Sequence, residues 1–387
     1  MRLLILLGLA CFASNISVRS VDPMLPLIAD YFGISLHRAA WLVTAYGIPY
    51  ALSQPVLGPI ADAFGKVRMI KVALLLLSGG FVLCALAPSF PLLIAARVVT
   101  GLVAGGVVPV AFAYLGDRIP YNERQYAISR VLIMVIFGQM GGATMAGVIG
   151  QYAGWRSVFF ISTAIVGVIA LLILFLLRSD DEQTRKFSLS RALADYRFLL
   201  TDRAALTVFA TVMCEGVFVY GVFPFVAPTL IEHGSGGPAV AGFVIGAFAL
   251  GGIVYAISAR QVVRALGPWH MMRVGGVIVG ICYLVVSTPV PWIAVACMFA
   301  IAGFGYYLLH NTMQVQGTEL APQARGAAVA LLASAFFIGQ GMGPVFTGYV
   351  SDAIGFSGMF IFMAALVASL GLISASVLRK TDKAPRA

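Results

Sequence analysis

The chain has 387 residues, of which 60% are hydrophobic and only 10% are charged, and its mean hydropathy is +0.97. A soluble protein of this length needs roughly a quarter of its residues charged. The composition therefore excludes a soluble globule and indicates a chain that folds in lipid. The formal net charge of +10 comes from loops between apolar runs, which suits contact with anionic lipid and gives nucleic-acid binding no support.

Short polar breaks divide the chain into apolar runs that are long enough to cross a bilayer, which takes about 20 residues. In the first half we predict spans at 3–31, 39–64, 70–88, 91–116, 126–152 and 156–178. In the second half we predict spans at 204–231, 238–260, 271–289, 292–316, 326–352 and 356–377. The expected fold class is therefore an all-α membrane protein with 12 transmembrane helices.

The first span has a competing interpretation. The segment MRLLILLGLACFAS has one Arg, a short apolar core and small residues, as a cleaved signal peptide has. A cut near Ala10 would leave an odd number of spans, and residues 11–31 continue as an apolar run. We therefore expect the segment to be kept as part of span one.

The distribution of Lys and Arg predicts the orientation of the chain. With the N-terminus inside, 21 of the 25 basic residues lie in inner loops and tails. Arg38 and Arg156 lie outside, and Arg19 and Arg97 fall within spans. We expect a multi-pass protein of a bacterial cytoplasmic (inner) membrane with both termini in the cytoplasm.

Residues 137–160 recur 201 positions later, at 338–361, with no gap. Gln139 aligns with Gln340, and Trp155 aligns with Phe356. The aligned glycines are Gly138, Gly142 and Gly147 with Gly339, Gly343 and Gly348, and Pro344 follows in the second copy only. Agreement of glutamine and aromatics in one frame indicates a tandem duplication. Glycines spaced about one helical turn apart predict helices that pack closely and can slide against each other.

The duplication predicts a six-helix bundle at 1–178, a cytoplasmic linker at 179–203, a second six-helix bundle at 204–379 and a tail at 380–387. In the linker, apolar residues at near-helical spacing alternate with basic ones. This pattern is typical of an amphipathic helix lying on the membrane surface. A segment that binds a partner is the alternative to a simple spacer.

Three motifs carry a resemblance to a known family. Gly58-Pro-Ile-Ala-Asp62-Ala-Phe-Gly65-Lys66-Val-Arg68, between spans two and three, is similar to the G-x-x-x-D-R-x-G-R-R/K signature of the major facilitator superfamily. In span four, Arg97-Val-Val-Thr-Gly101-Leu-Val-Ala-Gly105 resembles the R-x-x-x-G-x-x-x-G pattern of its drug:proton antiporters. In span one, Asp22-Pro-Met-Leu-Pro26 resembles their D-x-x-L-P segment. The resemblance covers essentially the whole chain and points to the Bcr/CflA-like multidrug efflux branch.

The sequence departs from these patterns at two positions. Ala63 follows Asp62 where the family usually has Arg, so one gating contact is in doubt. Ala143 stands where the antiporter signature G-x-x-x-G-P has proline, and that proline occurs instead at Pro344 in the second copy. The second departure weakens the expectation of export by antiport.

The resemblance implies two pseudo-symmetric bundles with a cavity lined by spans one, four, seven and ten. It also implies a gate in which Asp62, at the end of span two, faces the start of span eleven near Arg325. The residues that the resemblance assigns to gating are Gly58, Asp62, Gly65, Lys66, Arg68 and Arg325.

Charged residues at membrane depth are expensive and usually mark a functional site. Asp22 and Arg97 lie at matching depths in spans one and four, and Arg19 lies one helical turn before Asp22. The two guanidiniums favour an ionised carboxylate, whereas burial favours a neutral one. We therefore predict that Asp22, Arg19 and Arg97 form a proton-coupling site. A fixed salt bridge that holds the bundle together is the alternative.

Other polar residues within the spans are candidate substrate contacts. Glu215 in span seven has no evident basic partner in the sequence, so we expect it to be protonated or to bind a cationic solute. The further candidates are Tyr46, Tyr50 and Gln54 in span two, Tyr220 in span seven, and Tyr306, His310 and Asn311 in span ten. A lone histidine is more often a satisfied core residue than a relay, and that alternative stays open.

The sequence has no P-loop and no dinucleotide-binding motif, so we expect no enzymatic activity, no cofactor and no metal. Transport must then be driven by an ion gradient or by the gradient of the solute. We expect a monomeric secondary transporter that exports small apolar organic compounds, with protons as the coupling ion. A carrier of sugars, amino acids or organic anions is the alternative within transport. A membrane sensor or a membrane enzyme is the alternative outside it.

Overall fold

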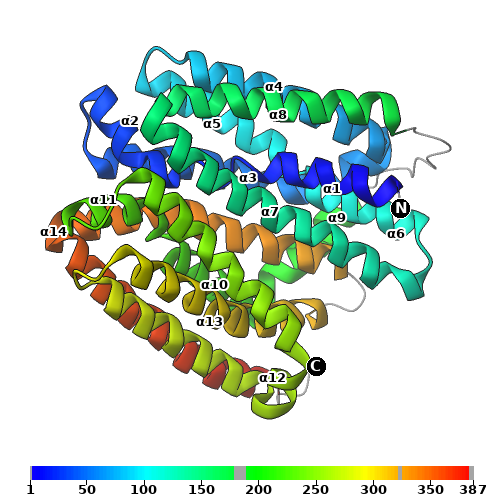
Figure 1. Ribbon diagram of the computed structural model, residues 1–387. Helices are drawn as coiled ribbons and strands as arrows, with labels where there is room; N and C mark the ends of the chain where they lie inside the picture. Colours follow the sequence, from blue (N-terminus) through cyan, green and yellow to red (C-terminus); the bar gives the residue numbers. More distant parts are fainter. Residues whose placement is uncertain (1, 178–188, 321–324, 383–387) are drawn as a thin grey trace. The chain divides into compact units, whose positions relative to one another are not determined.

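The computed structural model describes residues 2–177, 189–320 and 325–382, and every regular element in these ranges is helical (Figure 1). Linker residues 179–188 and tail residues 383–387 lie outside the described residues. The chain divides into two compact units, Met1–Ser188 and Leu189–Ala387. Each unit is described by itself.

The first unit contains six spans, four of them single uninterrupted helices and two of them interrupted. Its elements are α1 (Arg2–Asn15), the 3-10 helix η1 (Asp22–Met24), α2 (Leu25–Phe32), α3 (Leu36–Phe64), α4 (Lys66–Leu86), α5 (Phe90–Ala104), α6 (Val107–Arg118), α7 (Tyr121–Ala153) and α8 (Trp155–Leu176). Span one comprises α1, η1 and α2, and span four comprises α5 and α6. The first-half spans predicted from hydropathy all correspond to these elements.

The second unit begins with a linker helix and repeats the same order. Its elements are α9 (Leu189–Thr201), α10 (Arg203–Tyr220), the 3-10 helix η2 (Phe223–Phe225), α11 (Val226–Glu232), α12 (Pro238–Val286), α13 (Trp292–Glu319) and α14 (Arg325–Asp382). The apolar stretches in α12 and α14, Pro238–Val286 and Gly326–Leu378, have 49 and 53 residues, enough for two crossings each. Each of these helices bends once at a glycine with positive φ, Gly267 (65°) or Gly355 (73°).

Span one is broken near its middle, which the apolar run did not predict. Residues 16–21 are not helical, and the chain resumes through η1 at Asp22. Pro23 and Pro26 lie at the start of the resumed segments, where the missing N–H of proline costs least. The prediction that Arg19 and Asp22 share one face of a continuous helix was therefore wrong, although the two residues do lie together.

Glycines bring the long helices into close contact in both units. In the first unit, Gly138 and Gly142 of α7 lie against the backbone carbonyls of Phe12 and Ile16, where a Cβ atom would clash. In the second unit, Gly339 and Gly343 of α14 lie in the same way against Met213 and Val217. The partners as well as the glycines are 201 positions apart, so the duplication is visible in the packing. Gly147 lies further along α7, and Pro344 and Gly348 lie further along α14.

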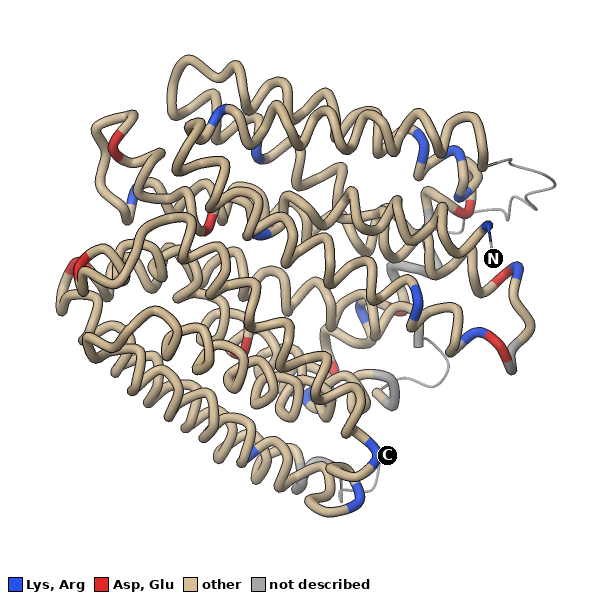
Figure 2. The backbone as a smooth tube through the Cα atoms, viewed as in Figure 1, with Lys and Arg blue, Asp and Glu red and all other residues tan. Residues whose placement is uncertain are grey.

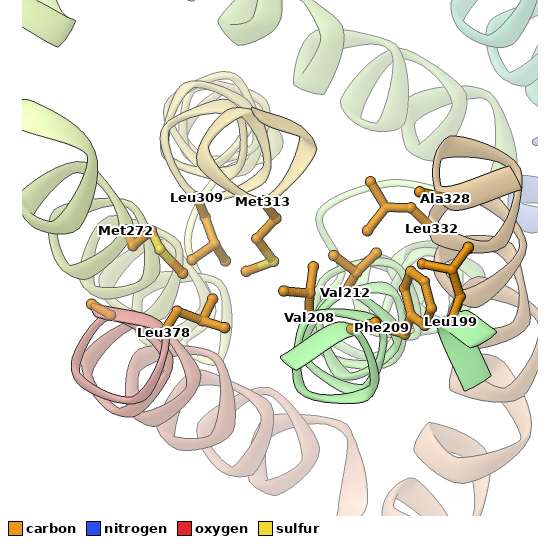
Figure 3. Packing of buried hydrophobic residues seen from close by; sticks show 12 residues of the cluster. Leu199, Val208, Phe209, Val212, Met272, Leu309, Met313, Ala328, Leu332 and Leu378 are labelled. Atoms are coloured by element: carbon orange, nitrogen blue, oxygen red, sulfur yellow. The ribbon is translucent and has the colours of Figure 1, made fainter. Parts of the chain in front are cut away.

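The linker helix α9 packs on the core of the second unit. Leu199 of α9 is fully buried in an apolar cluster with Val208, Phe209 and Val212 of α10 (Figure 3). The same cluster includes Met313 of α13 and other side chains from α12 and α14. Its neighbours Phe198 and Leu200 are 59% and 52% exposed. The described part of the linker is thus an amphipathic helix with one face against protein.

Charged residues are scarce within the helices, and Figure 2 shows long stretches of backbone without them. Arg156 at the start of α8 is held by aromatic rings, with its guanidinium carbon 4.3 Å from the Tyr31 ring and 4.2 Å from the Trp155 ring. Its Nη2 donates to the carbonyl of Ala87 at 2.8 Å. This contact ties the first turn of α8 to α2 and to the end of α4.

Candidate functional site

The break in span one places two charged side chains inside the first unit. Arg19 and Asp22 are both buried, and Arg19 Nη1 donates to Asp22 Oδ2 at 3.4 Å. The other carboxylate oxygen, Oδ1, is buried with no hydrogen-bond partner among the described residues. A break in a helix at this depth is tolerated only where it is enclosed by protein or lines a cavity. The break therefore presents a carboxylate that still has capacity to bind a proton or a donor.

Arg97 of α5 lies in the same unit and is fully buried. Its Nε donates to the carbonyl of Leu42 at 3.4 Å, and its guanidinium carbon lies 4.2 Å from the centre of the Tyr46 ring. Nη1 and Nη2 are buried without hydrogen-bond partners within the described part of the chain. The ion pair that the structure gives to Asp22 is with Arg19. Arg97 instead stacks on Tyr46 because its Nε is anchored to α3.

Two of the three polar residues predicted on span two also face this group. Ser17, within the break, donates its hydroxyl to the Tyr46 hydroxyl at 3.0 Å. The Tyr46 and Tyr50 rings stack at 5.7 Å between centres. Gln54, one turn further along α3, is buried. Span two therefore supplies a polar, aromatic wall to the charged group of Arg19, Asp22 and Arg97, which we call the charged cluster.

In the second unit, Glu215 has a basic partner that the sequence did not reveal. Its Oε2 lies 2.9 Å from Nδ1 of His310, which is 95 residues away in sequence. Gln314, one helical turn beyond His310, approaches the other ring nitrogen, with Nε2 to Nε2 at 3.0 Å. The expectation that Glu215 lacks a basic partner was wrong, and Gln314 was missed altogether. A glutamine at i+4 from a buried histidine was the signal available for it.

Aromatic rings surround the Glu215–His310 pair. Tyr306 stacks on His310 with 5.0 Å between ring centres, and the Phe336 ring lies 4.7 Å from that of His310. Tyr220 meets Tyr306 edge-on at 5.3 Å. Asn311, the position after His310, is half-buried. Of the polar residues predicted in spans seven and ten, the structure thus brings four together in one place: Glu215, Tyr220, Tyr306 and His310.

The residues assigned to gating form a turn with a branched ion pair. Gly65, between α3 and α4, has φ 95°, a conformation that residues with a Cβ rarely adopt. Lys66 Nζ lies 2.7 Å from Asp62 Oδ1 and 2.7 Å from Asp117 Oδ2. Arg68 is exposed and Gly58 is half-buried. The side chain of Arg325 lies outside what the structure describes, and the contact predicted for Asp62 with span eleven stays a prediction.

The architecture defines a class of protein. Broken membrane helices that enclose charged side chains, in two copies of one six-span unit, are the architecture of secondary transporters. The family model for the Major Facilitator Superfamily matches residues 5–329. The chain therefore belongs to the major facilitator superfamily and is not an enzyme.

Of three curated relatives of this chain, two align over most of their length and one over about a third of it. The MFS-type transporter YwfA of Bacillus subtilis is 22% identical over 97% of this chain and 92% of its own. The multidrug resistance protein MdtG of Salmonella arizonae is 23% identical over 93% of this chain and 91% of its own. The multidrug export protein EmrB of Escherichia coli K12 is 28% identical, but over only 47% of this chain and 36% of its own.

Solved transporters share the fold over the whole chain. A bacterial homologue of the human lysosomal transporter Spinster, in an inward-facing and unoccupied conformation, has a TM-score of 0.75 and 22% identity, covering 99% of this chain and 98% of its own. The likeness establishes an all-helical membrane protein with the major facilitator fold.

Proposed function

We propose that the chain is a proton-coupled exporter of small, largely apolar organic compounds that works by alternating access. The observation that carries the proposal is the charged cluster at the break in span one. Asp22 is buried at membrane depth, where an ionisable side chain usually belongs to an ion or proton pathway. Its neighbours, Arg19 at 3.4 Å and the buried Arg97, make its proton affinity depend on their distance.

The cluster can act as a switch without further parts. When Asp22 is ionised it attracts Arg19, and a proton on the carboxylate removes that attraction. If the two transport conformations place the guanidiniums at different distances, they bind the proton with different affinity, and the proton shifts the population between them. Proton-coupled transport requires a proton affinity that depends on conformation in this way.

The relatives' names and the membrane environment support the rest of the proposal. MdtG and EmrB are named as multidrug proteins, and the antiporter-like pattern from Arg97 to Gly105 is present. We propose that the substrate contacts polar residues of spans two, seven and ten, namely Tyr46, Tyr50, Gln54, Glu215, Tyr220, Tyr306, His310 and Asn311. We further propose a monomer in a bacterial inner membrane, as the similar protein YdhP of E. coli O157:H7 is named, with both termini in the cytoplasm.

A second candidate function follows from Arg97. Its two terminal nitrogens are buried donors without partners in the described residues, and a guanidinium binds planar carboxylates well. A carrier of a small organic anion would use these donors directly.

Transport by the purified full-length chain separates the two functions. In proteoliposomes with an imposed pH gradient, a panel of lipophilic dyes and a panel of labelled carboxylates would be compared. Gradient-driven accumulation of the dyes supports the exporter. Accumulation of carboxylates alone would replace it with the anion carrier, and movement that ignores the gradient would contradict proton coupling.

A further inference from the structure

We propose that Glu215 and His310 form a second proton-binding site, located in the second unit and separate from Asp22. The site consists of the Glu215 carboxylate of α10, the His310 imidazole of α13 and the Gln314 amide, which positions the ring. The role of this site in transport rests on the proposed proton coupling, but its existence does not.

Two hydrogen bonds determine which nitrogen of His310 carries a hydrogen before the site takes up an additional proton. Gln314 Nε2 has only hydrogens to offer, so it donates to His310 Nε2, which must carry a lone pair. The ring proton is then on Nδ1 and is donated to Glu215 Oε2 at 2.9 Å. In this state the imidazole is neutral and the carboxylate holds a full negative charge.

This negative charge has little compensation. Glu215 is 0% exposed, and its Oε1 is buried without a hydrogen-bond partner among the residues that the structure describes. A buried carboxylate that is not fully hydrogen-bonded carries a large free-energy cost. One added proton, on Oε1 or on His310 Nε2, makes the pair neutral overall.

Among the residues that the structure describes, the groups on the surrounding helices supply no alternative counter-charge. On α10 the nearest basic residue in sequence is Arg203, which is exposed and roughly 18 Å away along the helix axis. On α14, the stretch from Gly326 to Ser351 has Tyr349 as its only ionisable side chain, and it is 60% exposed. The phenols near the pair are those of Tyr220, Tyr306 and Tyr307, which are neutral at ordinary pH.

The described basic side chains on the two remaining neighbours, α9 and α12, are exposed or bonded to other residues. On α12, Arg260, Arg264 and His270 are exposed, Arg273 bonds Ser376, and the Tyr255 ring stacks on that of Tyr307. On α9, Arg197 is exposed, and Asp195 and Tyr196 are half-buried. A proton can therefore neutralise the pair without any further side chain.

The site is not a copy of the Asp22 site. Position 215 corresponds to Ser14 in the first unit, and Asp22 corresponds to Phe223 in the second, given the offset of 201. The two acids thus occupy positions eight residues apart in the repeat. Each unit has its own buried acid at its own depth, so the chain can hold two protons independently.

Infrared difference spectra test the proposal on the purified full-length protein in nanodiscs. Spectra at about pH 8 and about pH 5 would be compared, a range that covers the usual titration of such a pair. We expect one carboxyl or imidazole difference band that is lost in Glu215→Gln and also in His310→Gln. The band should persist in Glu232→Gln, an exposed glutamate of α11, and in Asp22→Asn.

A potentiometric titration counts the protons that each protein takes up between the two pH values. Glu215→Gln and His310→Gln should each take up one proton fewer than the wild type over the same pH range. Variants that fold, as judged by unchanged circular dichroism, yet keep the wild-type spectrum and proton count would overturn the proposal. If the band is present but no substrate moves with the pH gradient, the proton site stands and the proposed function fails.

Discussion

Residues 12–24 of the first unit and 213–225 of the second occupy corresponding places in the repeat, but the helix break is longer in the first, at 16–21 against 221–222, and the side chains differ in chemistry. Both contain a helix that packs on glycines of a partner helix, a break, and a 3-10 turn at corresponding positions, Asp22–Met24 and Phe223–Phe225. In the first unit Arg19 lies in the break and pairs with Asp22, the first residue of the 3-10 turn. In the second unit the same positions are Tyr220 and Phe223, whose rings pack at 4.9 Å.

The comparison extends to the neighbouring spans. At these positions of spans two and four the copies are offset by 202 residues, since Gly101 lies against Tyr46 as Gly303 lies against Phe248. Tyr46 and Arg97 then correspond to Phe248 and Phe299, and both phenylalanines pack on Phe223, at 5.1 and 5.6 Å. The same arrangement of helices therefore encloses a charged cluster in the first unit and an aromatic cluster in the second. Because the fold forms without the charges, their presence in the first unit points to function rather than to stability.

The first prediction tests whether the aromatic residues of the second unit can replace the charged pair of the first unit. Asp22→Phe alone leaves Arg19 buried without its carboxylate and should lower the free energy of unfolding by about 3–5 kcal/mol. Arg19→Tyr combined with Asp22→Phe should recover most of that loss, because the pair then matches the second unit. Thermal unfolding in detergent measures both. A double variant no more stable than Asp22→Phe would break the comparison.

The second prediction concerns coupling. Asp22→Asn mimics the protonated carboxylate permanently, so accumulation driven by a pH gradient should fall about tenfold to a hundredfold, while binding and downhill exchange persist. Asp30→Asn, an exposed acid of α2, is the matched control and should transport normally. Normal coupling in Asp22→Asn would assign the proton to another group, with Glu215 the first to examine.

The third prediction tests whether both units need the close helix contacts made at their glycines. Gly142→Val and Gly343→Val each place atoms against the backbone of the facing helix, and should destabilise their units by about 1–3 kcal/mol. Gly141→Val is the control, since a Cβ at Gly141 meets nothing within 4 Å. Equal stability of all three variants would mean that the close approach of α7 and α14 is not needed.

The fourth prediction concerns substrate contact in the second unit. If Glu215 also meets the substrate, Glu215→Gln should weaken the binding of cationic solutes about tenfold, or about 1.4 kcal/mol. Neutral solutes should bind as before, because the isosteric amide keeps the shape of the site. Equilibrium binding of a cationic and a neutral dye to the same preparation provides the check.

The smallest effect is expected at the turn between α3 and α4. Asp62→Asn removes one of the two carboxylates near Lys66 and the negative charge expected to favour a helix N-terminus, an interaction of roughly 0.3–1 kcal/mol. Transport should slow about twofold to fivefold with normal expression. The Lys66–Asp117 pair keeps the turn folded, so a loss of expression would contradict this account.

The sequence predicted the all-helical class and the spans because hydropathy and the positions of basic residues are local properties. The break at residues 16–21 was not predicted, since its residues continue the apolar run and only Pro23 and Pro26 mark its end. Contacts between residues far apart in the sequence were harder still to predict. Nothing near Glu215 in sequence points to His310, and the stacking of Arg97 on Tyr46 depends on how α3 packs against α5.

The aromatic clamp on Arg156 has a spectroscopic consequence. Of the four tryptophans, Trp41, Trp155, Trp269 and Trp292, Trp155 is the buried one, at 4% exposure, and its ring touches those of Tyr31 and Phe32 on α2. Its emission therefore reports on the distance between α2 and the start of α8. Phenylalanine at the other three positions would leave a protein whose intrinsic fluorescence follows the movement of span one, without any attached label.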